Sequence, residues 1–236
     1  MSSPFFSNKI SVIIPTYNEE DCIAGLVHYL QNDSSCNYIA EIIIADGGSK
    51  DNTKLEAEQA GATVISSKLK SRSLQMNLGA SHAQSEVLYF LHADTFPPKG
   101  FAKIILSSIH SGVTSGCFRL KFDLSHWFLN FNSWFTRFNI NAFRFGDQSL
   151  YVTASAFRLI SGFDPKRILL EDQEIITRLQ KVGQFKVLDQ SVVTSARQYK
   201  RSGIFRLQMV YYILYGLYLL GASQSFLWRK YRQWIY

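Results

Sequence analysis

Three short polar segments carry carboxylates directly after apolar runs of the sequence. They are Pro15-Thr16-Tyr17-Asn18-Glu19, Asp46-Gly47-Gly48-Ser49 and His92-Ala93-Asp94. Each apolar run has the character of a buried β-strand, and in an open α/β sheet ligands bind outside the carboxyl ends of the strands, where helix N-termini also point. We therefore expect the three segments to meet at one ligand site. The dinucleotide fingerprint G-x-G-x-x-G is absent after the first run, which disfavours a nicotinamide or flavin enzyme and leaves other nucleotides open.

The elements that must position these segments alternate along the first hundred residues. Apolar runs of strand length are followed by stretches of helical periodicity, an order typical of stacked βαβ units and a mostly parallel sheet. We predict an α/β fold, with acidic residues 19–21 in the first turn of its first helix. The predicted strands are 9–16, 41–45, 62–66 and 87–91. Three helices are predicted between them: one that begins at about Glu19, one that leads to Gly61, and one over 71–84.

The pattern is less regular beyond about residue 111. Strands are predicted at 114–122 and 185–194, and a helix at 170–182 with Gly183 as its stop. A further helix is predicted over 125–140, with Ser125 as its N-cap. Its aromatic residues recur at helical spacing, so that one face is almost wholly aromatic; they are Trp127, Phe128, Phe131, Trp134, Phe135 and Phe138.

Composition and charge limit the kind of protein. The chain has 236 residues, 47% of them hydrophobic and only 18% charged, so it can form a substantial core and is not expected to be disordered. Three cysteines without a C-x-x-C pair argue against a disulfide framework or a zinc site and favour a reducing compartment. No secretory signal is visible at the N-terminus, so we expect a cytoplasmic protein.

The formal charge of +7 is unevenly distributed. Residues 1–110 hold 8 Lys and Arg against 11 Asp and Glu, whereas residues 111–236 hold 17 against 7. The basic residues of the second half alternate with aromatic and aliphatic runs, which fits an anionic membrane surface or a phosphate-bearing lipid at least as well as nucleic acid. We expect no nucleic-acid partner.

The C-terminal segment is apolar but short. Residues 209–222 contain no charge or amide, yet a spanning helix needs about 20 apolar residues. The following tail, 226–236, alternates aromatic with basic residues, as expected of a chain that lies at a headgroup boundary. We divide the chain into residues 1–203, an α/β domain, and residues 204–236, a hydrophobic helical segment that is either membrane-associated or part of a soluble core.

The motifs together resemble family-2 glycosyltransferases. The resemblance is carried by residues 11–20 (Ser-Val-Ile-Ile-Pro-Thr-Tyr-Asn-Glu-Glu), 43–49 (Ile-Ile-Ala-Asp-Gly-Gly-Ser) and 88–95 (Leu-Tyr-Phe-Leu-His-Ala-Asp-Thr), and it extends through 71–80, 145–148 and 170–172. The sequences His-Ala-Asp and Gly-Asp-Gln are most similar to a small, single-domain bacterial branch of the family. The resemblance implies a GT-A-like fold with a mixed, mostly parallel sheet flanked by helices. It also implies a metal-dependent, inverting transfer of a sugar from a nucleotide diphosphate sugar, of the hexosyltransferase type.

The resemblance also implies roles on the donor side. Asp94 holds the last position of the family's D-x-D motif and would coordinate Mn²⁺ or Mg²⁺ at the donor diphosphate. His92 stands where the broader pattern has the first carboxylate, so it is either a ligand, a supporting residue or a packed one. Lys68 and Lys70 are interpreted as a solvated helix face. The expected nucleotide-binding residues are Pro15, Tyr17 as a stacking face, Glu19, Asp46 and Arg72, although the segment at Asp46 could simply be a tight turn with a helix cap.

On the acceptor side, Asp172 matches the catalytic base of the family. Its place in the first turn of a helix would favour the ionised form. The alternative is an ordinary structural role, because acidic residues in a first helical turn commonly just complement the helix dipole. Glu171 would support it. Asp147 and Gln148 would line the acceptor side, and Arg197 belongs to a basic cluster either near the diphosphate or on a membrane-facing surface.

Three functions follow from this pattern. The first is a glycosyltransferase, peripheral at the inner face of the cell membrane, with a lipid or lipid-linked acceptor. The second is a non-catalytic nucleotide-sugar or lipid-binding protein, favoured by the missing first carboxylate of the metal motif. A nucleotidyltransferase is disfavoured because no basic Gly-rich loop follows the first strand.

Overall fold

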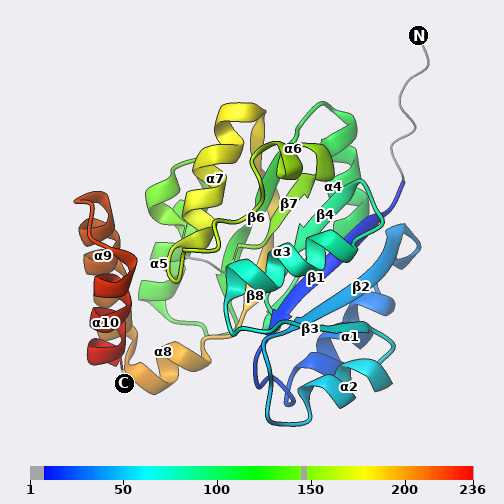
Figure 1. Cartoon of the computed structure of the whole chain (residues 1–236). Helices are drawn as coiled ribbons and strands as arrows, with labels where there is room; N and C mark the ends of the chain where they lie inside the picture. Colours follow the sequence, from blue (N-terminus) through cyan, green and yellow to red (C-terminus); the bar gives the residue numbers. More distant parts are fainter. Residues whose placement is uncertain (1–7, 145–147, 236) are drawn as a thin grey trace.

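The computed structural model describes residues 8–144 and 148–235. The protein is built on one mixed sheet (Figure 1). The strand order is β3-β2-β1-β4-β7-β6-β8-β5. Parallel pairs join β1 to β2 and β4, β2 to β3, and β6 to β8, whereas β7 runs antiparallel to β4 and β6, and β5 runs antiparallel to β8. The strands are β1 (Ile10–Thr16), β2 (Ile39–Asp46), β3 (Thr63–Ser66), β4 (Val87–Phe90), β5 (Thr95–Phe96), β6 (Ser115–Phe122), β7 (Leu150–Thr153) and β8 (Phe185–Thr194).

Helices cover both faces of the sheet. Strand side chains alternate between the faces, so Val12 and Ile14 pack under one layer of helices and Ile13 under the other. The first layer is α1, α2 and α4, and the second is α3, α6 and α7. These helices are α1 (Ile23–Gln31), α2 (Thr53–Gln59), α3 (Arg72–His82), α4 (Phe101–His110), α6 (Ala154–Leu159) and α7 (Glu171–Val182).

The remaining helices lie beside the sheet at one end of the molecule (Figure 1). They are α5 (Trp127–Trp134), α8 (Arg197–Ser202), α9 (Ile204–Leu219) and α10 (Gln224–Ile235). A small core of Leu129, Ala196, Tyr199 and Leu207 joins α5, α8 and α9. Within the part of the chain that the structure describes, no helix has the length and apolar character needed to cross a membrane.

Two predicted helices begin later than expected. The first begins at Ile23 rather than near Glu19, because residues 19–21 form a turn whose groups bond to the loop after β2: Glu19 N–H donates to Thr53 Oγ1, and Asn52 N–H to Glu20 Oε2, each at 2.8 Å. Its first turn therefore holds no acidic residue. The aromatic helix begins at Trp127 with His126 as N-cap in place of Ser125, and it ends at Trp134, where the 3-10 turn η2 (Phe135–Arg137) follows.

Candidate active site

The predicted site segments meet where the sheet reverses its winding. Strand β1 lies between β2 and β4, and the chain passes from β1 outward to β2 and β3 before it returns to β4. Ligands of open α/β sheets bind at the carboxyl ends of strands at such a switch point. Thr16 is paired with Asp46, and Ile13 with Phe90, so the segments after β1, β2 and β4 leave the sheet at one edge.

Arg197 joins two of the predicted carboxylates. Its Nη2 lies 2.6 Å from Glu19 Oε1 and 3.3 Å from Asp94 Oδ2. The pairing of Thr95 with Thr194, and a hydrogen bond of 3.1 Å from Ser195 N–H to the Asp94 carbonyl, bring the first turn of α8 to the end of β4. Partial burial lowers the pKa of Arg197, but the hydrogen bond to Glu19 and the charges of Glu19 and Asp94 outweigh burial and raise the pKa overall.

An open cavity of about 230 Å³ lies beside this ion-pair cluster. Asp94, Arg197 and Cys22 line it, together with Asp123, which sequence reasoning missed. The Asp123 carboxylate accepts a hydrogen bond of 2.8 Å from Ala196 N–H, so it positions the start of α8. Burial, and then the neighbouring Glu19 carboxylate, raise the pKa of Cys22 to about 12, which keeps this thiol protonated.

Asp46 is fully buried and organises its own loop. One carboxylate oxygen accepts 2.9 Å hydrogen bonds from the N–H groups of Gly48 and Ser49, and the other accepts the Ser49 hydroxyl. Gln75 of α3 locks the same edge, since its Nε2 donates to the carbonyls of Thr16 and Ala45, each at 2.7 Å. The geometry is that of the tight turn considered for this segment, and any contact of Asp46 with a nucleotide remains a proposal.

The first turn of α7 brings Asp172 to the end of β4. His92 Nε2 lies 4.0 Å from Asp172 Oδ2, and both side chains are largely buried. Pro15, at the end of β1, lines the same small cavity as these two residues. Glu171 is buried beside them and pairs with Arg72 Nη1 at 3.6 Å. Asp172 and Glu171 therefore lie close to the ends of β1 and β4, and Arg72, predicted to bind the nucleotide, pairs with Glu171.

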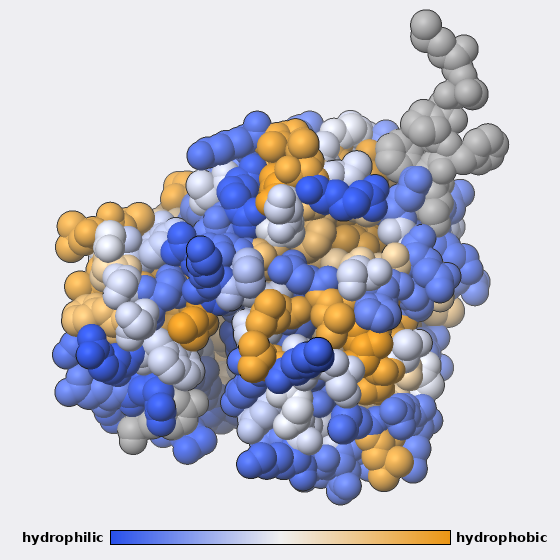
Figure 2. All heavy atoms as spheres, viewed as in Figure 1, coloured by the Kyte–Doolittle hydropathy of each residue, from blue (hydrophilic) through white to orange (hydrophobic). Residues whose placement is uncertain are grey.

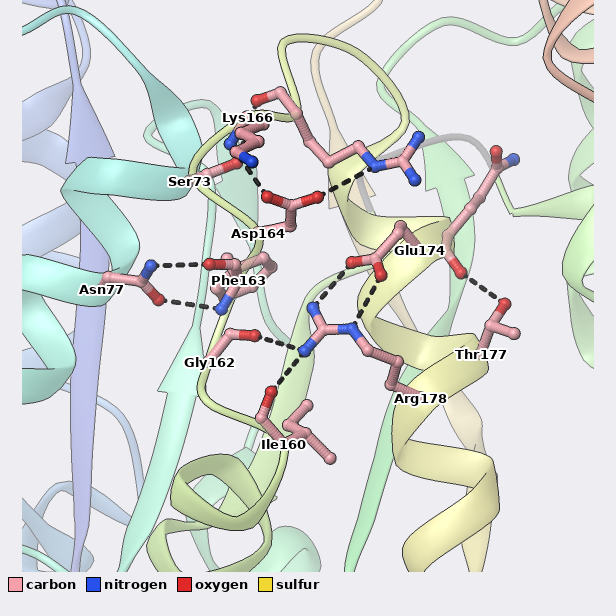
Figure 3. Close-up of polar contacts among 12 residues, drawn as sticks. Ser73, Asn77, Ile160, Gly162, Phe163, Asp164, Lys166, Glu174, Thr177 and Arg178 are labelled. Carbon is pink, nitrogen blue, oxygen red and sulfur yellow. Dashed lines mark hydrogen bonds and ion pairs between the residues drawn. The ribbon is translucent and has the colours of Figure 1, made fainter. Parts of the chain in front are cut away.

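A hydrogen-bond network fixes α7 against α3 (Figure 3). Arg178 of α7 pairs with Glu174 and donates to the carbonyls of Ile160 and Gly162 at 2.6 and 2.7 Å. Asn77 of α3 bonds both the N–H and the carbonyl of Phe163 at 2.9 and 2.8 Å. The loop at 160–163 thus links the two helices that carry Asp172 and Arg72.

Two other predicted residues have partners that the sequence did not indicate. Lys70 Nζ lies 3.4 Å from the centroid of the Tyr17 ring, so the residue interpreted as a solvated face covers the expected stacking surface. Gln148 is buried, and its Nε2 donates to the carbonyls of Phe118 and Thr136 at 3.1 and 3.3 Å. Asp147 lies outside the described residues.

Left-handed backbone conformations also mark this region. Four non-glycine residues among those described have positive φ: Asn18 at 54°, Ser149 at 61°, Ser161 at 61° and Leu170 at 63°. Three of them are next to a predicted site residue, namely Glu19, Gln148 and Glu171, whereas Ser161 lies in the loop that links α6 to α7. Non-glycine residues with positive φ are uncommon and cluster at binding and catalytic sites, where surrounding structure holds them. The pattern independently supports a site at this edge.

A divalent cation fits this edge only together with a ligand. Among residues 8–144 and 148–235, no group of three His, Cys, Asp or Glu side chains could enclose an ion. Asp94 offers a partly exposed carboxylate at the cavity. Mg²⁺ and similar hard cations are commonly held by one or two carboxylates plus phosphate oxygens and waters. The donor set therefore fits a cation that binds with a diphosphate, rather than a cage of protein ligands.

Comparison with known proteins identifies the family. Residues 11–162, well over half of the chain, match Glycosyl transferase family 2. The chain belongs to this family. The family-2 chain is 35% identical over 91 residues to Protein RfbJ of Shigella flexneri, a match that covers 38% of the chain and 67% of RfbJ. The resemblance seen in the sequence is thereby confirmed.

Solved structures confirm the fold of this family-2 member. Mannosyltransferase PcManGT from Pyrobaculum calidifontis, in complex with GDP-Man and Mn²⁺, is similar with a TM-score of 0.70 and 15% identity over 91% of this chain and 64% of PcManGT. S. aureus TarS 1-349 in complex with UDP-GlcNAc is similar with a TM-score of 0.65 and 17% identity, over 87% of this chain and 66% of the TarS chain. The chain thus spans less than two thirds of the length of PcManGT. The predicted GT-A-like, mostly parallel sheet is correct.

Proposed function

We propose that this chain is a metal-dependent inverting glycosyltransferase of the hexosyltransferase type. It would transfer a sugar from a nucleotide diphosphate sugar to an acceptor hydroxyl. The single observation that carries the proposal is the arrangement at the switch point: Arg197 joins Glu19 to Asp94, and His92, two residues before Asp94, lies beside Asp172. A cation and diphosphate site and a carboxylate base would then be adjacent. PcManGT holds GDP-Man and Mn²⁺ on the same fold, which supports this class of donor and cofactor.

Each residue has a defined part in the proposed reaction. Asp172 accepts the proton of the acceptor hydroxyl as that oxygen bonds to the anomeric carbon from the side opposite the leaving group. The bond from the anomeric carbon to the diphosphate oxygen breaks, and its electron pair leaves with the diphosphate, whose charge Arg197 stabilises. Asp94 would hold Mn²⁺ or Mg²⁺, which supplies further charge stabilisation to the leaving diphosphate. Glu171, which pairs with Arg72, would support the start of α7. Arg72 and the segments at Pro15, Tyr17, Glu19 and Asp46 would bind the donor nucleotide.

The test of the base is Asp172→Asn. We expect turnover to fall by about 10²–10⁴-fold, the usual contribution of a general base, with donor affinity nearly unchanged. Asp189→Asn is the matched control, because Asp189 is exposed and pairs only with Arg119 among the described contacts. Turnover is measured with a panel of nucleotide sugars, and the product anomer by NMR. Wild-type turnover in Asp172→Asn would disprove the assignment, and retention of configuration would disprove inversion.

The test of the metal residue is Asp94→Ala. Donor binding is measured by thermal shift with Mn²⁺, with Mg²⁺ and with chelator, because a ligand of the folded state raises apparent stability. We expect the wild type to bind the donor more tightly with the cation and the variant to lose that dependence. An unchanged cation effect in Asp94→Ala would contradict the role of Asp94. Donor binding without any hydrolysis by the wild type would favour the non-catalytic binding protein instead.

We further propose a lipid or lipid-linked acceptor and a peripheral position at the inner face of the cell membrane. The support is the basic, aromatic second half of the chain, which suits a surface of anionic headgroups. The apolar residues of α5 and α9 that the structure leaves exposed add to this support.

A further inference from the structure

Two apolar stripes are exposed on α5 and α9. On α5 and the turn after it, Trp127, Phe131, Trp134 and Phe138 follow one another at helical spacing, and the first two are 68% and 58% exposed. On α9, Phe205, Met209, Tyr212 and Ile213 do the same, and Met209 is 53% exposed. Residues three and four apart lie on one side of a helix, so each set forms a continuous stripe. We call these eight residues the aromatic face.

The two stripes are neighbours. The Phe205 ring lies 4.7 Å from that of Phe128 and 6.1 Å from that of Trp127, and the Tyr212 hydroxyl bonds Asn132 of α5. The opposite side of α9 is also apolar, with Leu207, Val210 and Leu214 buried. A helix that is apolar all round is usually buried on every side. The exposed side of α9 therefore calls for an apolar partner, and Figure 2 shows hydrophobic side chains gathered at the α9 edge of the molecule.

The charge of the segments that carry the aromatic face and of the helices next to it indicates the chemistry of that partner. Residues 124–144 and 190–236 contain nine Lys and Arg and neither Asp nor Glu. Several of these cations lie over aromatic rings: Arg137 lies 4.3 Å from the Trp134 ring, and Lys230 lies 5.6 Å from the Trp234 ring. Basic and aromatic side chains interleaved in this way suit a headgroup boundary, with the rings in the acyl region and the cations against phosphates.

We propose that the aromatic face docks on the surface of an anionic lipid bilayer. A second copy of the chain is a poorer partner, because pairing two such faces would bring together segments that are rich in Lys and Arg and contain neither Asp nor Glu. With 16 residues α9 is too short to span, so it would lie in the plane of the interface. The docking gives the proposed lipid-linked acceptor a surface of entry, and to that extent it rests on the proposed function.

The docked surface is also tied to the proposed base. Gln224, the first residue of α10, accepts hydrogen bonds of 3.0 Å from the N–H groups of both Ile168 and Leu169. Leu169 itself packs against the core shared by α9 and α10. Asp172 follows three residues later, so the docking helices and the start of α7 are held together.

Vesicle flotation tests the docking. Phosphatidylcholine vesicles with and without phosphatidylglycerol are mixed with the wild type, with Trp127→Ser/Phe131→Ser, and with the matched control Leu55→Ser/Leu159→Ser, whose exposed leucines lie on α2 and α6. We expect the wild type and control to float with the anionic vesicles and the aromatic variant to lose about tenfold or more in partitioning. Met209→Ser/Ile213→Ser repeats the test on α9, so that a folding defect caused by substitutions in one helix cannot by itself account for a loss of flotation.

Donor hydrolysis without vesicles separates this inference from the proposed function. Flotation that depends on the aromatic face supports docking even if no donor is hydrolysed, in which case the enzymatic proposal alone fails. A wild type that hydrolyses donor but stays at the bottom of the gradient overturns docking alone. Equal flotation of wild type and both face variants also overturns it. Light scattering that shows a dimer lost in both face variants, without flotation, would replace the lipid surface with a second copy.

Discussion

Arg197 holds two carboxylates with a single guanidinium group. Glu19 and Asp94 come from the ends of different strands, and without a cation between them their like charges would raise the cost of ionising either one. The pKa of Arg197 is raised by the same attraction: partial burial alone would lower this pKa, but the neighbouring Glu19 and Asp94 carboxylates together have the larger effect. A bound diphosphate would offer this guanidinium oxygens of the same charge and geometry.

Arg197→Ala should weaken donor binding by roughly 10- to 100-fold, the loss expected for charge-assisted hydrogen bonds to a diphosphate. The donor affinity of Arg197→Lys should lie between those of the wild type and Arg197→Ala, since an ammonium group keeps the charge but lacks the planar fork of a guanidinium. Isothermal titration with the donor and Mn²⁺ measures the effect. Arg158→Ala, on the exposed side of α6, is the control and should bind like the wild type. Equal donor affinity in Arg197→Ala would place the residue outside the binding site.

The carboxylates of the site could be predicted from sequence because a strand end is a local feature. Their partners could not, because they are distant in the chain. Arg197 is 178 positions from Glu19, and long-range contacts such as the pairing of β5 with β8 place the start of α8 at this edge of the sheet. Lys70, interpreted as part of a solvated helix face, is exposed as expected, but it precedes α3 and lies over the Tyr17 ring. The sequence also did not indicate that the amide of Gln148 bonds two backbone carbonyls, and its place beside the acceptor stays a prediction.

At the scale of elements, α3 lies directly on β1 because Gly79 has no side chain. A Cβ at Gly79 would overlap Cγ2 of Ile13, whereas a Cβ at Gly25, also inside a helix, would meet no atom within 4 Å. The close approach has a functional consequence, since α3 carries Arg72 and also Gln75, which locks the ends of β1 and β2.

These two glycines predict opposite changes in stability. Gly79→Ala should lower the free energy of unfolding by about 1–3 kcal/mol through overpacking. Gly25→Ala should raise it by about 0.5–1 kcal/mol, because alanine favours the helix and nothing obstructs its methyl group. Urea denaturation followed by circular dichroism measures both. If Gly79→Ala is as stable as the wild type, the contact between α3 and β1 is not as tight as described.

Several elements were predicted well, short ones included: β3 and β4 have four residues each and lie within the strands predicted at 62–66 and 87–91. The strand predicted at 185–194 is β8 residue for residue, and the helix predicted at 170–182 begins one residue later as α7. By contrast, α4, β7 and α6 were not predicted. Strand β7 has only four residues, and a short apolar run cannot be assigned to strand or helix by its period. Its antiparallel place between β4 and β6 depends on contacts that no local pattern contains.

At the scale of the whole molecule, the two predicted parts of the chain share cores. Residues 1–203 and 204–236 were separated on composition, and this division stays a prediction. Leu207 of α9 packs with Leu129 and Tyr199, and Gln224 of α10 holds the backbone before α7. The α/β part is therefore contacted by α9 through Leu207 and by α10 through Gln224, which holds the segment just before Asp172.

Buried protonated groups predict how the whole fold responds to alkali. Burial raises the pKa of Cys117 from an ordinary value near 9 to about 11, and burial also raises the pKa of Tyr89 and of Tyr151. The unfolded chain therefore releases these protons at lower pH than the folded chain, so the unfolded state binds fewer protons above pH 9, and stability falls as pH rises.

The contribution of the protonated Cys117 thiol to the free energy of unfolding should be complete below pH 9. Between pH 9 and 11 it should decrease by about 1.4 kcal/mol per pH unit. Urea midpoints measured across this range test the prediction. Cys117→Ala removes one titrating group while it keeps an apolar side chain in the β6 interior, so its stability should decline less steeply with pH than that of the wild type, whatever its stability at neutral pH. Parallel declines in the two proteins would mean that the Cys117 thiol is not held protonated by the fold, and the alkaline loss would then belong to Cys22 and the buried tyrosines.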